Sequence, residues 1–292
     1  MKDARVSLAA ALVLLALGCT AQTGKVTVLL KDAPSNVTAA VVTISEIDLV
    51  GSGGVTVLST TRTTTDLLSL ANDTATLVDG VEVPAGTYSQ LRFVITGGYV
   101  EADGVVYASS PSYEGLPSEI TPGGTLRMPS YAQSGLKIDL PGGAVTVGTA
   151  TTVLLVDFDV SQSFGHEAGG SGAWVMHPVA KATDFALAGS VDVTLRLGSG
   201  VTLPAPATLA DFKAVLTPAP PASGGNTILA LTSSDATTYG ASFKYLFPGD
   251  YTLTFNAPSS VNAFVTAPPV PASVTVTSGQ ATTAAFVLSS AH

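Results

Sequence analysis

The sequence predicts an all-β protein of two β-sandwiches, immunoglobulin-like or prealbumin-like, that follow an N-terminal signal peptide. Beyond residue 24 apolar residues alternate with polar ones, which is the period of a strand with one buried face. Clusters of Gly, Pro, Asn and Asp separate these runs, as between the strands of sandwiches. Hydrophobic residues make up 46% of the chain and charged residues 11%, which allows a core and is typical of exported β proteins. Only residues 64–73 have a helical pattern, and we expect a single turn there, capped by Thr65 or Asp66.

The first sandwich is predicted for residues 25–185. Residues 38–50 are rich in β-branched side chains, and the Gly-rich residues 51–54 then lead into VTVLS, which is the pattern of a hairpin. Residues 90–95 and 152–160 each place alternate apolar residues on one face of a strand. The long, loose segment that follows residue 98 departs from a compact core, and we expect a surface excursion there.

A second sandwich is predicted for residues 189–292, where the alternation restarts after a break. Both sandwiches contain one corner motif, in residues 83–93 and 247–255: an apolar residue, Pro, a small or turn residue, Tyr and then a strand. Pro fixes φ and Gly accepts positive φ, so a tight corner delivers the Tyr into the strand. We expect the Tyr hydroxyl to return to the backbone of the corner, in a structural rather than a catalytic role.

The N-terminus has the pattern of a targeting segment. Lys2 and Arg5 give it a positive start, and residues 6–18 are uncharged and apolar. That run is shorter than the roughly 20 residues that span a bilayer, and it matches the apolar region of a secretory signal peptide. Cys19, the only cysteine of the chain, follows directly.

The residues Ala16-Leu17-Gly18-Cys19 resemble a bacterial lipobox, with Ala and Leu where Leu and a small residue are usual. The resemblance implies a signal peptide of residues 1–18, cleavage before Cys19, a diacylglyceryl thioether on its sulfur and an acylated amino group. Residues 19–24 would then form a tether, and the acyl chains would hold the protein stably on a membrane. Thr20 stands where Asp resembles an inner-membrane retention signal, which favours the outer membrane. The alternative is an ordinary secreted protein whose cysteine lies near the cleavage site by chance.

The first sandwich resembles bacterial lipoproteins that carry a domain of unknown function, number 4382. Seven segments carry the resemblance in the family's order: residues 29–35, 41–54, 64–70, 83–95, 134–140, 154–164 and 174–185. Residues 189–292 resemble the carboxypeptidase regulatory-like, or transthyretin-like, sandwiches, through PGDYTLTF followed by VTVTSGQATTAAFVL. The resemblance implies the fold and an exported location, and no reaction.

Asp157 and Asp159 are the candidate metal ligands, because residues two apart on a strand share a face. Calcium takes several oxygen ligands, and a third acid such as Asp48, Asp139 or Asp184 would complete a shell. The alternative is that the strand ends there and the two acids lie in solvent or cap the following loop. Calcium is the one cofactor that the sequence suggests.

Trp174, the only tryptophan, is the candidate for stacking on a sugar; the alternative is a core residue. His166, His177 and His292 have no zinc-ligand spacing, and no nucleophile motif marks a serine. The net charge of −9 argues against nucleic acid as a partner.

The sequence therefore predicts a non-enzymatic, lipid-anchored protein of the cell envelope. Its role would be binding or structural display, with a glycan or an envelope protein as partner. The alternative is a carbohydrate-active or peptide hydrolase with the second sandwich as an accessory, which requires an acid-lined cleft.

Overall fold

The computed structural model describes residues 22–33, 37–129, 131–164, 171–220, 225–235 and 237–292. The signal peptide and Cys19 lie outside these ranges. As predicted, nearly all regular structure is β, and the sheets form sandwiches. Among the described residues, no helix is both long and apolar enough to cross a membrane.

The N-terminal sandwich consists of strands β1 to β13 in two sheets. One sheet has the order β13-β11-β1-β5, and the other has the order β12-β8-β7-β6-β2-β3, with β9 and β10 on β6 and β4 on β2. The strands are β1 (Thr23–Ala33), β2 (Ala39–Gly51), β3 (Gly54–Ser59), β4 (Thr63–Asp66), β5 (Ala75–Pro84), β6 (Gly86–Ala102), β7 (Val105–Ala108), β8 (Gly124–Arg127), β9 (Leu136–Asp139), β10 (Val145–Val147), β11 (Thr151–Asp159), β12 (Ala173–Val175) and β13 (Val179–Asp184). The helical pieces are η1 (Leu67–Leu70), η2 (Pro141–Gly143), α1 (Val160–Ser163) and η3 (Phe185–Leu187).

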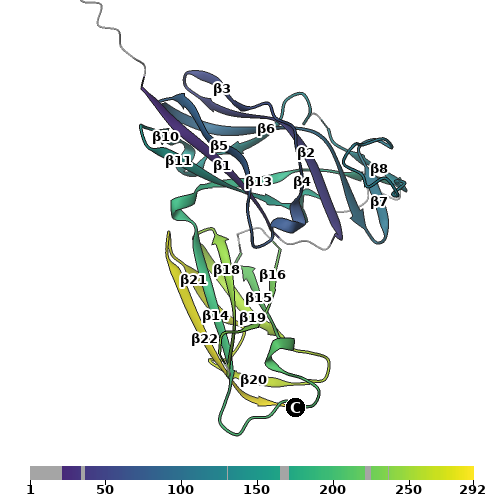
Figure 1. The fold of residues 1–292 in the computed structure, drawn as a ribbon, viewed down its shortest axis with the longest axis vertical. Helices are drawn as coiled ribbons and strands as arrows, with labels where there is room; N and C mark the ends of the chain where they lie inside the picture. Colours follow the sequence, from purple (N-terminus) through teal and green to yellow (C-terminus); the bar gives the residue numbers. More distant parts are fainter. Residues whose placement is uncertain (1–21, 34–36, 130, 165–170, 221–224, 236) are drawn as a thin grey trace, which may run out of the picture.

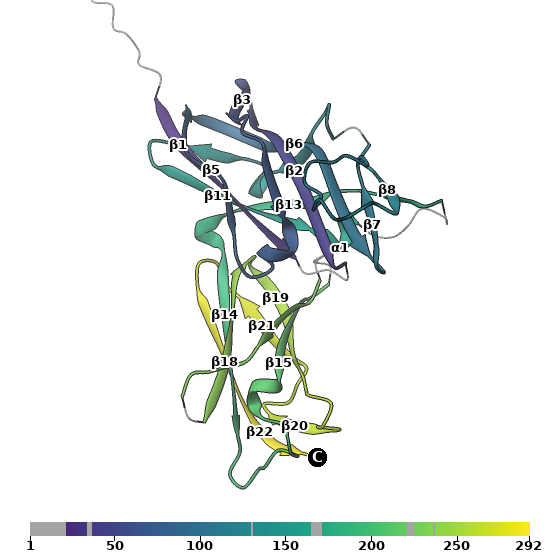
Figure 2. The same cartoon turned by 45° about the vertical axis from the view of Figure 1, so that its right-hand side comes forward.

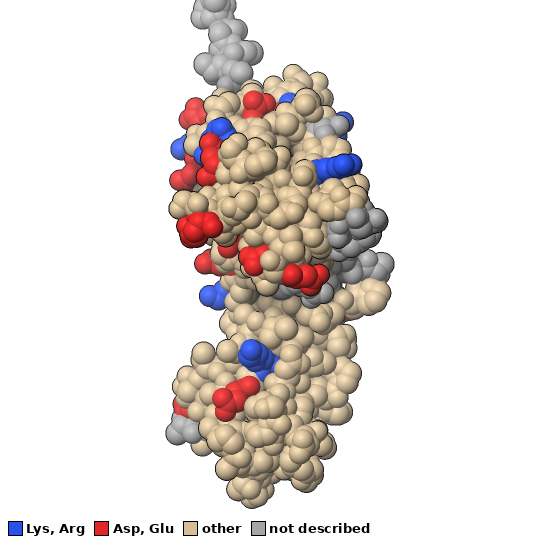
Figure 3. All heavy atoms as spheres, turned by 90° about the vertical axis from the view of Figure 1, so that its right-hand side faces the viewer, with Lys and Arg blue, Asp and Glu red and all other residues tan. Residues whose placement is uncertain are grey.

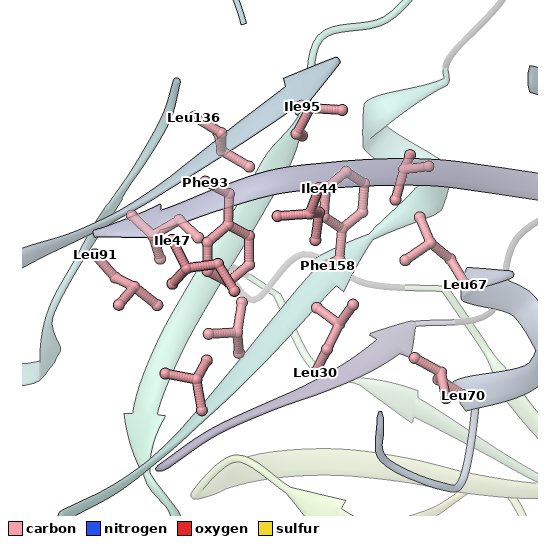
Figure 4. Packing of buried hydrophobic residues seen from close by; sticks show 14 of the residues in the cluster. Leu30, Ile44, Ile47, Leu67, Leu70, Leu91, Phe93, Ile95, Leu136 and Phe158 are labelled. Carbon is pink, nitrogen blue, oxygen red and sulfur yellow. The ribbon is translucent and has the colours of Figure 1, made fainter. Parts of the chain in front are cut away.

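Alternate residues of β6 and β11 fill the space between these two sheets, as their pattern predicts. Leu91, Phe93 and Ile95 of β6 are at most 1% exposed, and Phe158 of β11 is fully buried. Figure 4 shows Phe93 and Phe158 pointing into one cluster with residues from both sheets. Burial of such side chains contributes about 1.5–3 kcal/mol each, so this cluster supplies the main stabilisation of the sandwich.

The predicted helical turn is the 3-10 helix η1, and Asp66 is its cap. The Asp66 carboxylate accepts a hydrogen bond from the Leu68 N–H at 3.2 Å. Leu67 and Leu70 of this turn are buried in the same cluster as Phe93, so η1 closes the open end of the sandwich.

The C-terminal sandwich consists of strands β14 to β22, also in two sheets. Their orders are β17-β18-β14-β22-β20 and β16-β15-β19-β21. The elements are β14 (Gly189–Leu197), η4 (Leu209–Asp211), β15 (Lys213–Pro218), β16 (Thr227–Ala230), β17 (Thr232–Ser233), β18 (Thr238–Leu246), β19 (Gly249–Asn256), β20 (Phe264–Ala267), β21 (Ala272–Val276) and β22 (Ala281–Ala291). Its core cluster shares no residue with that of the N-terminal sandwich.

The two sandwiches follow one another along the long axis of the molecule (Figure 1). β1 starts at the top of the N-terminal sandwich, beside the β2–β3 hairpin, and the C-terminus lies at the far end of the C-terminal sandwich. Figure 2 shows the same arrangement from a second direction. The point where the described chain begins and its last residue are therefore at opposite ends.

Both predicted corners have the expected hydrogen bond. The Tyr88 hydroxyl donates to the Pro84 carbonyl at 2.7 Å, and the Tyr251 hydroxyl donates to the Phe247 carbonyl at 2.9 Å. In each case the acceptor lies four residues before the Tyr, so the ring locks the corner that precedes its own strand.

The segment after residue 98 is more integrated than its sequence predicts. β7 and β8 extend the sheet of β6, and Tyr113 is only 8% exposed. Its hydroxyl lies 2.6 Å from the Thr43 hydroxyl, and its ring packs in a small cluster with Val41 and Tyr99 on the outer face of β2 and β6. The expected surface excursion is therefore partly wrong, because one aromatic anchors the segment to the sheet.

Candidate functional site

The chain enters the N-terminal sandwich three residues after Cys19. The Gln22 carbonyl accepts a hydrogen bond from the Ala85 N–H at 2.7 Å, and β1 begins at Thr23. The last two residues of the predicted tether, Thr23 and Gly24, therefore belong to the strand. Cys19 itself lies outside the described residues, so its lipidation stays a prediction.

Asp157 forms an ion pair instead of facing an open site. Its Oδ2 atom is 3.1 Å from the Lys31 Nζ atom, and the two residues are register partners on the parallel strands β1 and β11. The side chain of Lys31 is 9% exposed and that of Asp157 is 20% exposed. The ammonium group supplies the positive charge for which a cation would otherwise be needed.

Asp159 caps α1. Its carboxylate accepts hydrogen bonds from the Gln162 N–H at 3.0 Å and the Ser161 hydroxyl at 2.7 Å, and also from the Gln162 side-chain amide. The Gln162 N–H is the backbone donor that an N-cap carboxylate satisfies at the first turn of a helix, and the two side-chain donors add to it. The geometry matches the capping role that the sequence left open as the alternative to calcium.

The other acids that the sequence offers as calcium ligands lie elsewhere. Asp48 is fully buried and pairs with Arg92, whose Nε atom is 2.8 Å from Asp48 Oδ2. Asp184 accepts from the Ala186 N–H at the start of η3, and Asp139 lies on β9 beside Gln90. No group of three His, Cys, Asp or Glu side chains suited to a metal ion occurs among the residues that the structure describes.

Trp174 lies in the core rather than on the surface. It is 7% exposed, and its ring centroid is 5.0 Å from that of Tyr107 in the cluster between the sheets. A buried indole offers no face to a sugar in this conformation.

The histidines do not form a site among the described residues. The side chain of His177 is exposed, and its backbone N–H donates to the Ser163 carbonyl. His166 lies outside the described residues.

The junction between the sandwiches is held by Asn72, which follows η1. Its side-chain amide donates to the Ser242 carbonyl at 2.9 Å and accepts from the Lys244 N–H at 2.8 Å. β17 pairs with β18 only at Tyr239 and Gly240, so the amide group takes the position of a neighbouring strand further along β18. Two hydrogen bonds between one side chain and a strand edge fix a direction as well as a distance.

The corner of the C-terminal sandwich meets the ion pair of the N-terminal one. The Lys31 ammonium lies 5.6 Å from the centroid of the Phe247 ring, within the range of a cation–π contact. Burial raises the pKa of Tyr251 to about 12, and the Asp157 carboxylate adds to this rise across the junction. The acid predicted to bind calcium therefore lies at the junction of the two sandwiches, next to Lys31.

The C-terminal sandwich has a hollow of about 470 Å³ at the end away from this junction. Leu197, Val201, Leu203 and Leu209 supply its apolar walls, and Thr202, Thr208, Thr237 and Tyr239 supply hydroxyl groups. A second hollow, of about 350 Å³, lies near the junction beside Phe185 and Tyr245. No Asp, Glu or His lines either of these two hollows.

Sequence reasoning missed both Asn72 and the distal hollow. Asn72 and Ser242 are 170 residues apart, and no local pattern connects them. The hollow is formed where the loop between β14 and η4 packs against β18. The sequence of this loop is rich in Pro and Ala and indicates only a connection between strands.

The fold and these contacts define an all-β protein of two stacked sandwiches in which the acids proposed as metal ligands have protein partners, in ion pairs, caps and side-chain hydrogen bonds. Residues 23–178 match the family model "Domain of unknown function (DUF4382)". The match covers more than half of the chain, and the protein therefore belongs to this family. No curated protein matches the chain in sequence.

Solved structures give only distant matches. A leucine-rich repeat protein from Bacteroides thetaiotaomicron VPI-5482 is 14% identical with a TM-score of 0.24, over 92% of this chain and 26% of that one. The Bacillus anthracis TIE protein is 11% identical with a TM-score of 0.23, over 92% and 34%. The minor pilin GBS52 of Streptococcus agalactiae is 9% identical with a TM-score of 0.26, over 90% and 95%. This chain thus spans about a quarter to a third of the first two proteins.

Proposed function

We propose that this protein is a non-enzymatic, lipid-anchored protein of the cell envelope, in which two stacked sandwiches hold a binding surface away from the membrane. One observation carries the proposal: the chain leaves the described structure three residues from its only cysteine, at the end opposite the C-terminal sandwich. A lipid on Cys19 then orients the whole molecule. The favoured location is the outer membrane.

The distal hollow is the proposed contact for a partner. Its volume falls within the roughly 300–1,000 Å³ of small-ligand sites, and its walls combine apolar side chains with hydroxyl groups. The C-terminal sandwich contains only seven charged residues, Asp192, Arg196, Asp211, Lys213, Asp235, Lys244 and Asp250. In the view of Figure 3 most of its surface is uncharged. A neutral glycan or an uncharged patch of an envelope protein fits this chemistry better than a charged ligand.

The arrangement of acids supports a role without catalysis. Glycoside and peptide hydrolysis need carboxylates or a nucleophile beside a cavity. Neither described hollow is lined by Asp, Glu or His, so the Ser, Thr and Tyr hydroxyl groups there have no carboxylate or imidazole beside them as a base. Asp48, Asp157 and Asp159 are engaged in an ion pair or a cap. These engagements favour binding or display over the hydrolase alternative.

The anchor is tested by metabolic labelling with a palmitate analogue in a bacterial host. We expect label on the wild type and on Thr20→Ala, and none on Cys19→Ala. Equal labelling of wild type and Cys19→Ala would show that the lipid is not on this cysteine. An unlabelled wild type would show that the protein has no lipid anchor.

The binding role is tested with a soluble form of residues 20–292 on a panel of neutral glycans and envelope proteins. Thr202→Trp places a bulky ring in the distal hollow, whereas Ser259→Trp, in the turn after β19, leaves the hollow open. We expect a ligand of the hollow to lose affinity for the first variant only. Equal binding by both variants would exclude the hollow as the contact.

A further inference from the structure

Three turns form the end of the N-terminal sandwich where the chain enters. Strand register brings them together: Thr23 pairs with Pro84, Gly86 with Val147, and Tyr88 with Gly51. The turns are residues 51–54, 84–86 and 148–150, and we call them, together with Val55 and Val57 of β3, the anchor end. Figures 1 and 2 both show the β2–β3 hairpin beside the start of β1 at the top of the molecule.

The anchor end carries no charge and exposes apolar side chains. The three turns read GSGG, PAG and GTA, without an acidic or basic residue. Val55 is 53% exposed and Val57 is 50% exposed, on the outward face of the edge strand β3. The first charged residues along β1 and β5 are Lys25 and Glu82, which are register partners of opposite sign.

The length of the chain before β1 brings this end close to a lipid on Cys19. Gln22 is fixed to Ala85 by a hydrogen bond, and three Cα steps of about 3.8 Å separate it from Cys19. The lipid attachment therefore lies within about 11 Å of Gln22. This distance is close to the Debye length of about 8 Å at physiological ionic strength, so any carboxylate at the anchor end would feel an anionic headgroup layer.

From these observations we propose that the anchor end rests on the lipid headgroup layer, with the hairpin tip and its two valines in contact with it. The inference rests on the proposed lipid anchor at Cys19. An acidic chain of net charge −9 gains from meeting an anionic surface with its uncharged end. The exposed valines gain from burial against the membrane interface, as apolar groups do in interfacial proteins. The acylated protein would thus contact the membrane through one defined face and keep a fixed orientation on it.

The test uses the acylated full protein in vesicles of phosphatidylethanolamine and phosphatidylglycerol that contain a headgroup spin-labelled lipid. Since Cys19 is blocked by acylation, a fluorophore is attached through Ser52→Cys at the hairpin tip, or through Ser259→Cys in the C-terminal sandwich as control. Flotation with the vesicles reports the anchor, and quenching of the fluorophore reports contact with headgroups. We expect both labelled proteins to float and the Ser52 position to be quenched several-fold more than the Ser259 position.

A second pair of variants tests the cause of the contact. Val55→Asp with Val57→Asp places two carboxylates at the anchor end, and Val265→Asp changes a valine that is equally exposed, at 55%, on β20. We expect the double variant to float but to lose most of the quenching at Ser52, and Val265→Asp to keep it. Equal quenching at Ser52 and Ser259 in proteins that float would overturn this proposal and leave the anchor intact. Failure to float would overturn the anchor and this proposal together.

Discussion

Tyr88 and Tyr251 have the same role in two sandwiches that share no core residue. Each hydroxyl donates to a carbonyl four residues earlier, and each ring is at most 9% exposed. Local sequence predicts these contacts because Pro, the turn residue and Tyr all lie within one corner.

Removal of either hydroxyl should destabilise its own sandwich. Tyr88→Phe and Tyr251→Phe keep the ring but leave a partly buried carbonyl without its donor, so we expect a loss of about 1–2 kcal/mol in the free energy of unfolding. Trp174 is the only tryptophan and belongs to the N-terminal core, so its fluorescence follows that sandwich in a urea titration. Circular dichroism follows both sandwiches. Tyr239→Phe, at the wall of the distal hollow, is the control, and a similar loss in all three variants would contradict a special role for the corners.

Tyr251 should also make the free energy of unfolding fall at alkaline pH. Its folded pKa is raised to about 12 by burial and by the Asp157 carboxylate, above the value of about 10 for an unfolded tyrosine. Folding therefore favours the protonated hydroxyl. The stabilisation is complete below pH 10 and is lost as pH rises from 10 toward 12, because the unfolded chain has then released the proton.

We expect the free energy of unfolding to fall more steeply between pH 10 and 12 in the wild type than in Tyr251→Phe. The ultraviolet titration of the eight tyrosines should lose its latest component in this variant. Identical alkaline slopes would show that Tyr251 ionises like an exposed phenol.

At the scale of elements, the strands of both sandwiches follow from local patterns, and the links between them do not. Alternating apolar residues predict β6 and β11, because one buried face is enough to produce the pattern. The same pattern reads Val160 as the end of a strand, although it begins α1. The partners of Asp157 and Trp174, Lys31 and Tyr107, are 126 and 67 residues away by sequence number, so spacing leaves their roles open.

Asp159→Ala should destabilise the N-terminal sandwich by about 1 kcal/mol, since an N-cap is lost at α1. Asp159→Asn keeps an acceptor and should cost less. The measurement is a urea titration followed by Trp174 fluorescence. Because Asp157 and Asp159 already have protein partners, we also expect EDTA to leave the melting temperature of the wild type unchanged. A clear drop with EDTA that disappears in Asp159→Asn would favour the calcium site instead.

At the scale of the whole molecule, the junction determines whether the two sandwiches keep a fixed orientation relative to one another. Asn72 contributes two hydrogen bonds to the edge of β18, while Lys31 lies over Phe247 and next to Asp157. The two hydrophobic clusters remain separate, so these contacts, together with the ring contact of Phe185 in η3 with Tyr245 of β18 at 6.0 Å between centroids, carry the orientation. A fixed orientation would hold the distal hollow at a constant distance from an anchored Cys19.

Asn72→Ala should loosen this junction without unfolding either sandwich, because both bonds come from one side chain outside the two cores. We expect a broader distribution of distances between spin labels at Ser52→Cys and Ser259→Cys, measured by double electron–electron resonance on residues 20–292. Asn226→Ala, which removes a hydrogen bond to Thr217 within the C-terminal sandwich, should leave the distribution narrow. If Asn72→Ala is as narrow as the wild type, the remaining junction contacts, at the Phe247 corner and between Phe185 and Tyr245, hold the sandwiches without Asn72. If the wild type is already broad, the stacked arrangement is one of many in solution, and the distal hollow has no fixed height above the membrane.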